Sequence, residues 1–111
     1  MPKYLALFAY SNEAMAAMIE SPAEREPAVR AVLESVGARL EALYWMFGAH
    51  DGIAIVDAPD SLTMAGVSAA VSSTGSIRSE TYELFSSEDV QHILETARQA
   101  RDHFARPGQL S

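Results

Sequence analysis

The chain contains no cysteine among its 111 residues. A disulfide framework, a thiolate nucleophile and a cysteine-ligated zinc site are therefore all excluded. The fold must be held together by a hydrophobic core, and a chain of this length can form one core and little more. The same length is typical of one domain and leaves no room for two.

Positive charge is scarce. Eight lysines and arginines stand against fifteen aspartates and glutamates, which gives a net charge of −7. A nucleic-acid interface needs a basic patch that neutralises phosphates, and this composition cannot easily supply one. The acidic balance instead favours a protein that stays dispersed in water.

Long hydrophobic runs are missing as well. No stretch approaches the roughly 18 unbroken apolar residues that a membrane-spanning helix needs. The apolar run that ends at Tyr10 is too short for a signal peptide, and no small-residue cleavage site follows it. The composition is otherwise that of a globular protein, with 49% hydrophobic and 21% charged residues. We therefore expect a cytoplasmic protein.

Alternating apolar residues without internal proline predict four strands. These cover residues 3–10, 38–47, 51–57 and 77–85. Helical spacing and capping residues predict the helices between and after the strands. They are a short helix after Ser11 or Asn12, a break near residues 20–26, and helices over 27–36, 62–74 and 86–105.

The two central helices each offer a face for the sheet. Val29, Val32, Leu33 and Val36 form an apolar stripe on the first, and Gly37 ends it in a left-handed conformation. The second is rich in small residues, which allow close approach to a sheet. Its predicted close face consists of Leu62, Ala65, Ala69 and Ser73.

The resulting order is β-α-β-β-α-β-α. Its first six elements are the split βαβ pattern of ferredoxin-like folds, an α+β class with helices on one face of a four-stranded antiparallel sheet. Residues 1–85 are predicted to form this core. The helix over residues 86–105 is expected to pack on the same domain, and residues 106–111 are expected to form a loose tail.

Both faces of the predicted sheet are largely apolar. Strict alternation places Leu40, Ala42, Tyr44 and Met46 on one face of the second strand, with Leu43, Trp45 and Phe47 on the other. A monomer with one bare face would expose more apolar surface than monomers tolerate. A second copy related by a two-fold axis is the simplest cover, which predicts a homodimer or a higher homo-oligomer.

Several segments, in order and spacing, resemble GYD-domain proteins over nearly the whole chain. They are Pro2–Lys3–Tyr4–Leu5, VLESVG at 32–37, YWMFGAHDG at 44–52, Asp57–Ala58–Pro59–Asp60 and AVSSTG at 70–75. The family is named for a Gly-x-Tyr-Asp corner, and here Gly48, His50 and Asp51 occupy it, with histidine in place of tyrosine. The resemblance implies a dimeric α/β barrel. Related barrels include cofactor-free monooxygenases, polyketide cyclases and haem-degrading enzymes, an analogy of fold only.

His50 and Asp51 are the candidate catalytic residues. A histidine beside a carboxylate can act as a general base with its tautomer fixed. Neighbours on a strand point to opposite faces, so the pair cooperates only if the hairpin corner breaks the alternation. The alternative is structural: Asp51 hydrogen-bonds the turn backbone, and His50 fills the space of the family's tyrosine.

Five residues are candidates for contacting a small apolar or aromatic ligand. They are Tyr10, Tyr44, Trp45, Tyr82 and Ser72. The aromatic side chains suit a flat or polyketide-like ligand, but aromatic packing in the sheet and dimer core explains them equally well. Ser72 stands near the end of a helix, where its hydroxyl can bond a ligand or the backbone.

No cofactor or metal is expected, because His92 and His103 are too far apart on the last helix to chelate one ion. Three functions remain open. The first is a small-molecule-binding homodimer with its pocket between sheet and helices. The second is a cofactor-independent enzyme of the monooxygenase or cyclase type, and the third is a non-catalytic oligomeric or regulatory module.

Overall fold

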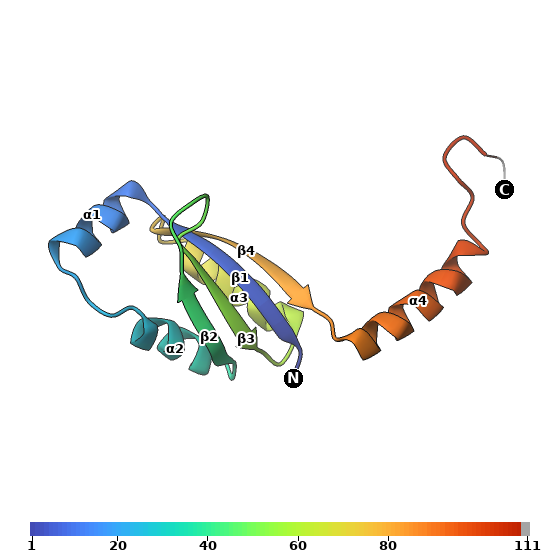
Figure 1. Ribbon diagram of the computed structural model, residues 1–111, viewed down its shortest axis with the longest axis horizontal. Helices are drawn as coiled ribbons and strands as arrows, with labels where there is room; N and C mark the ends of the chain where they lie inside the picture. The colour runs from blue at the N-terminus through green and yellow to red at the C-terminus, as the bar shows by residue number, and fades with distance from the viewer. Residues whose placement is uncertain (110–111) are drawn as a thin grey trace.

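The computed structural model describes residues 1–109 and has the predicted α+β architecture (Figure 1). One antiparallel sheet with the order β2-β3-β1-β4 contains four strands, consistent with a ferredoxin-like fold. The strands are β1 (Lys3–Tyr10), β2 (Arg39–Trp45), β3 (Gly52–Asp57) and β4 (Ile77–Leu84). The helices are α1 (Asn12–Glu20), α2 (Glu26–Glu34), α3 (Ser61–Ser72) and α4 (Ser87–Arg101). The predicted tail, residues 106–111, lies partly outside the described residues.

Local capping interactions fix where α1, α3 and α4 begin. The Ser11 side chain accepts a hydrogen bond from the Ala14 amide at 3.0 Å, and Asp60 accepts one from Thr63 at 2.8 Å. Ser86 opens α4 with a capping box. Each cap satisfies a backbone donor that the first helical turn would otherwise leave unpaired. These helix starts agree with the sequence.

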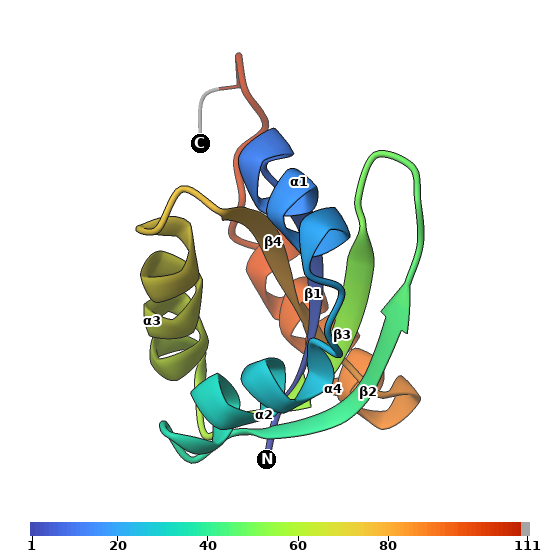
Figure 2. The ribbon, with the colours of Figure 1, turned by 90° about the vertical axis from the view of Figure 1, so that its left-hand side faces the viewer.

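Helices α2 and α3 lie on one side of the sheet, and the other side is open (Figure 2). The core lies between the helices and the inner face of the strands. Its buried apolar residues are Tyr4, Phe8, Leu33, Ala38, Leu40, Ala54, Val56, Ala58 and Met64. The inner face therefore carries the hydrophobic core, and the open face carries none of these residues.

The predicted close face of α3 is wrong. Met64 is buried and Val67 packs against the core, whereas Leu62 is 85% exposed and Ala65 and Ala69 are exposed. Apolar and small residues surround this helix on all sides, so its sequence contains no stripe that marks one face.

A β-bulge in β2 overturns the strict alternation predicted for this strand. The register to β3 shifts between Leu40 and Ala42, which leaves Glu41 as an extra residue. Leu40 is buried, but beyond the bulge Leu43 packs against the core and Ala42 does not. One extra residue reverses the faces of all residues that follow it. Tyr44 therefore faces outward with Ala42.

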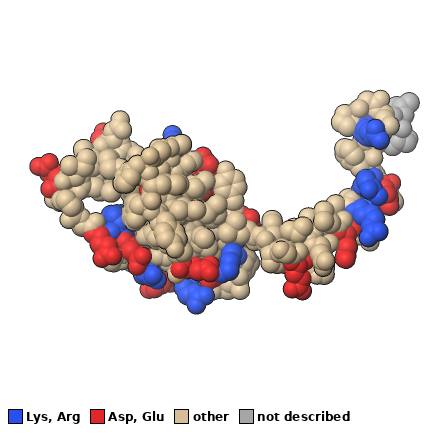
Figure 3. Space-filling view, in the orientation of Figure 1, with Lys and Arg blue, Asp and Glu red and all other residues tan. Residues whose placement is uncertain are grey.

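The open face is apolar at its centre. Partners in the register place Leu5 beside Ile55 and Leu7 beside Ile53, with Tyr44 and Tyr82 next to them. Figure 3 looks onto this face, and uncharged side chains cover the middle of the sheet while charged side chains gather towards its edges.

Helix α4 projects away from the sheet (Figure 1), so within one chain it does not pack on the domain as the sequence predicted. All of its residues are exposed, including Val90, Ile93 and Leu94. The radius of gyration of 18.3 Å exceeds the roughly 13 Å of a compact domain of this length. Among the described residues, no helix combines the length and apolarity needed to cross a membrane.

Candidate functional site

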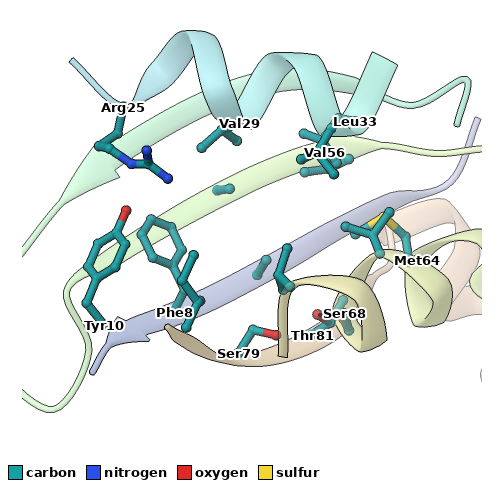
Figure 4. A pocket seen from close by; sticks show the side chains of 16 residues that line it. Phe8, Tyr10, Arg25, Val29, Leu33, Val56, Met64, Ser68, Ser79 and Thr81 are labelled. Atoms are coloured by element: carbon teal, nitrogen blue, oxygen red, sulfur yellow. Dashed lines mark hydrogen bonds between the residues drawn. The ribbon is translucent and has the colours of Figure 1, made fainter. Parts of the chain in front are cut away.

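An apolar cavity lies between the inner face of the sheet and helices α2 and α3 (Figure 4). Its volume is about 100 Å³. Engineered apolar cavities of roughly 150 Å³ take up benzene, so this smaller space accommodates at most the apolar part of a small organic molecule. Most of the lining is aliphatic or aromatic, with Val29, Val56 and Met64 among the residues that line it.

A few polar groups face this apolar space. Ser68 Oγ and Thr81 Oγ1 form a hydrogen bond with each other at 3.1 Å. Within residues 1–109, Ser79 Oγ and Arg25 Nε are buried and have no hydrogen-bond partner, and both residues line the cavity. A buried polar group without a partner is costly, and native proteins usually satisfy it with a protein group, a water or a ligand.

Three aromatic rings form one end of the cavity wall. Trp45 stacks on Tyr10 with ring centroids 6.1 Å apart and contacts Phe8 edge-on at 5.6 Å. Phe8 and Tyr10 also meet edge-on at 5.9 Å. Phe8 and Tyr10 line the cavity directly. Trp45 does not line it but packs against both of these rings. The β2 bulge is what brings Trp45 to this face.

The structure does not bring the two predicted catalytic residues together. Asp51 Oδ2 accepts a hydrogen bond from the Tyr10 amide at 2.9 Å, and the Asp51 amide donates to the Phe8 carbonyl at 2.8 Å. Asp51 therefore ties the β2–β3 loop to the end of β1. The structural alternative placed the Asp51 hydrogen bond on the turn backbone, whereas here its carboxylate binds the backbone of β1.

His50 pairs with Glu80 and not with Asp51. His50 Nε2 lies 3.4 Å from Glu80 Oε1, and the Tyr82 hydroxyl donates to Glu80 Oε2 at 3.0 Å. The bond from Tyr82, followed by the one from His50, lowers the pKa of Glu80. The same carboxylate raises the pKa of Tyr82. None of these three residues lines the cavity.

The five predicted ligand contacts are divided between different surfaces. Tyr10 lines the cavity and Trp45 supports it. Tyr44 and Tyr82 are 66% and 52% exposed and belong to the open face. Ser72 lines a separate shallow depression near Gly75 that also touches Tyr10. Tyr10 is thus the predicted residue that the structure places at the cavity.

A second polar cluster lies on the open face and consists of ion pairs that link three strands. Asp57 is buried, and its two carboxylate oxygens receive Lys3 Nζ and Arg39 Nη2, each at 2.8 Å. The hydrogen bond from Lys3 and then that from Arg39 lower the pKa of Asp57. Lys3 also binds the bulged Glu41 at 2.8 Å. The cluster joins β1, β2 and β3 at one end of these strands.

Sequence reasoning missed the polar lining of the cavity. Ser79 and Thr81 occupy the inward positions of β4, and the alternation of that strand contains this signal. Arg25 carried no such signal, because it stands between Glu24 and Glu26 and looks like part of a solvated charge cluster. Only the packing of α2 on the sheet places its side chain at the cavity.

Over residues 1–109, no three histidine, aspartate or glutamate side chains gather in a way that could hold a metal ion.

Comparison with protein families gives one match, a model described as GYD domain that covers residues 4–94. This span includes the four strands except Lys3 at the start of β1, the helices α1, α2 and α3, and the first half of α4. Neither a curated protein nor a solved structure matches the chain significantly.

Proposed function

The chain belongs to the GYD-domain family, and from this premise we propose that it binds a small molecule in the cavity between its sheet and helices α2 and α3. One observation carries the proposal: the cavity is almost wholly apolar, yet buried polar atoms without partners face it. Apolar walls with a few convergent polar groups are the usual design of a ligand site.

Thermal-shift screening tests this directly. Phenols, quinones and polyketide-like acids should raise the melting temperature, because a ligand that binds only the folded state stabilises it. Ala6→Leu places a larger side chain in the cavity and should abolish the shift. Ala69→Leu, on the exposed side of α3, is the matched control and should retain it. No shift with any compound, or equal shifts in both variants, contradicts the proposal.

The same screen separates binding from the other two functions. A non-catalytic oligomeric module would show no ligand-induced shift. A cofactor-independent enzyme of the monooxygenase or cyclase type would show the shift together with turnover of the bound compound. That alternative has its best support in His50, which has an orienting carboxylate in Glu80. Binding ranks first because His50 does not line the cavity.

We further propose that the protein is a homodimer that pairs through the open sheet face, as in a dimeric α/β barrel. A face of four strands about 4.8 Å apart and about seven residues long covers roughly 450 Å². Two such faces bury less than the roughly 1,200 Å² of the smallest stable interfaces. The exposed apolar stripe of α4 supplies the missing area if it also packs on the second copy.

Light scattering coupled to size exclusion tests this assembly. The wild type should have twice the mass of one chain, and Leu7→Glu on the open face or Ile93→Glu on α4 should give monomers. Gln99→Glu adds the same charge to the polar side of α4 and should remain dimeric. A monomeric wild type would refute the dimer. A higher homo-oligomer would show that further surfaces take part.

The cytoplasmic location remains a prediction from the sequence.

A further inference from the structure

Arg25 is the one charged residue among those that line the cavity. It immediately precedes α2, and its Nε atom is buried without a hydrogen-bond partner in the part of the chain that the structure describes. Figure 4 shows the guanidinium group extending from the start of α2 toward the rings of Tyr10 and Phe8. The guanidinium group therefore lies at the aromatic end of the cavity, with its Nε atom buried.

No acidic side chain neutralises this cation among residues 1–109. The ion pairs of the described chain use Lys3, Arg30, Arg39, Arg101 and two histidines, and none includes Arg25. Its neighbour Glu26 pairs with Arg30 at 3.3 Å instead. In a chain with fifteen acidic residues, an unpaired and partly buried arginine is unusual. Burying such a charge is costly unless a partner completes it.

The N-terminus of α2 adds partial positive charge beside the Arg25 guanidinium. Arginine is unfavourable at the N-terminus of a helix, because the helix dipole already concentrates partial positive charge there. Arg25 occupies the N-cap of α2 and makes no capping bond with its side chain. The guanidinium and the helix terminus thus act in the same direction at this end of the cavity, and both attract an anion.

From these observations we infer that the ligand is a small aromatic or branched aliphatic carboxylic acid, bound with its carboxylate on Arg25. The inference rests on the proposed function and names its ligand class. A guanidinium group binds a carboxylate with parallel hydrogen bonds, which gives orientation as well as affinity. The apolar body then lies among Val29, Val56 and Met64. Ser79 Oγ has no hydrogen-bond partner within residues 1–109. It forms a hydrogen bond with an oxygen substituent on the apolar part of the ligand.

Benzoate and its neutral counterpart benzamide are the probes. Calorimetric titration of the full chain should show tighter binding of benzoate, by about tenfold or more, as expected for a hydrogen-bonded charge pair. Arg25→Gln should remove that preference by weakening benzoate about tenfold to a hundredfold while benzamide changes little. Arg30→Gln, on the same helix but outside the cavity lining and in an ion pair with Glu26, is the matched control and should bind like the wild type.

Each outcome decides the inference. Equal affinities of benzoate and benzamide for the wild type overturn it but leave the proposed pocket standing, and this comparison needs no variant to fold. Equal loss of benzoate binding in Arg25→Gln and Arg30→Gln attributes the effect to overall charge and also overturns it. If neither compound binds, the inference and the proposed function both fail for aromatic ligands. Amide shifts at Val29 and Val56 on titration with benzoate, lost in Arg25→Gln, support it.

Discussion

Gly52 is the position where a single added carbon conflicts most with the fold. It pairs with Phe8 across β1 and β3, and the Phe8 ring lies directly over it. A Cβ atom at position 52 would lie 2.6 Å from Phe8 Cε2 and 2.9 Å from Cε1, and closer still to Cζ. Carbon atoms normally approach to about 3.5–4.0 Å, so in Gly52→Ala the ring has to move.

The cost follows from what holds the ring. Phe8 is 8% exposed and contacts Tyr10 and Trp45 edge-on. Inserting a carbon into a packed core costs about 1–3 kcal/mol, and each displaced aromatic contact adds about 0.5–1.5 kcal/mol. Replacing a strand glycine recovers about 0.5–1 kcal/mol of backbone entropy. Gly52→Ala should therefore lower the free energy of unfolding by roughly 2 kcal/mol, which corresponds to about 10 °C in melting temperature.

Urea unfolding followed by tryptophan fluorescence measures this change, because Trp45 is the single tryptophan and contacts Phe8. All variants need one protein concentration, since dimerisation would make stability depend on it. Gly66→Ala in α3 is the control: an added Cβ there meets nothing within 4 Å. Its stability should rise by about 0.5–1 kcal/mol, because alanine is the better helix former.

A second substitution distinguishes the steric explanation from a general strand effect. Phe8→Leu shortens the side chain that blocks position 52, so Gly52→Ala should cost much less in that background, a measurable coupling between two contacting residues. A Gly52→Ala variant as stable as the wild type would refute the steric clash. So would an equal loss in free energy of unfolding with phenylalanine and with leucine at position 8.

Three further predictions concern ionisable residues. Lys3 and Arg39 lower the pKa of Asp57 in the folded chain below its ordinary value of 3.8. As the pH drops, the unfolded chain therefore takes up a proton at Asp57 before the folded chain does. The free energy of unfolding should fall as the pH drops through and below 3.8. Acid titration of Asp57→Asn should show a shallower decline, and equal slopes would contradict the role of this cluster. Asp51→Ala removes the acceptor of the Tyr10 amide and should cost about 1–2 kcal/mol in urea unfolding, whereas no loss would show that the loop is held otherwise. His50→Phe should fold and keep the ligand-induced rise in melting temperature, because His50 does not line the cavity; loss of that rise in a folded variant would assign His50 to the ligand site.

The sequence predicted those parts of the fold that depend on neighbours along the chain. Strand β1, the caps at Ser11, Asp60 and Ser86, and the left-handed Gly37 all follow from residues within a few positions of each other. The side-chain type decides each of them, whatever the rest of the molecule does.

The features that the sequence did not predict depend on tertiary packing. The bulge at Glu41 belongs to the register between β2 and β3, which no pattern within β2 alone specifies. The buried side of α3 is set by where the sheet lies, since the helix is apolar on every side. Arg25 becomes a cavity residue only after α2 has packed. The candidate site was thus predicted in its aromatic part, through Tyr10 and Trp45, and not in its charged part.

The bulge also has a consequence for how this chain can change in evolution. Glu41 is one extra residue in β2, and the bulge absorbs it, so that Trp45 still lies on the helix side of the sheet and Tyr44 on the open face. Deleting that residue would restore the regular pleat and leave each ring on its present side, because Leu40 would still pair with Val56 and Ala42 with the adjacent Ile55. A loss of three nucleotides at codon 41 would therefore cost the chain the carboxylate that binds Lys3 without turning either ring, so β2 can change in length at this point and keep its two faces.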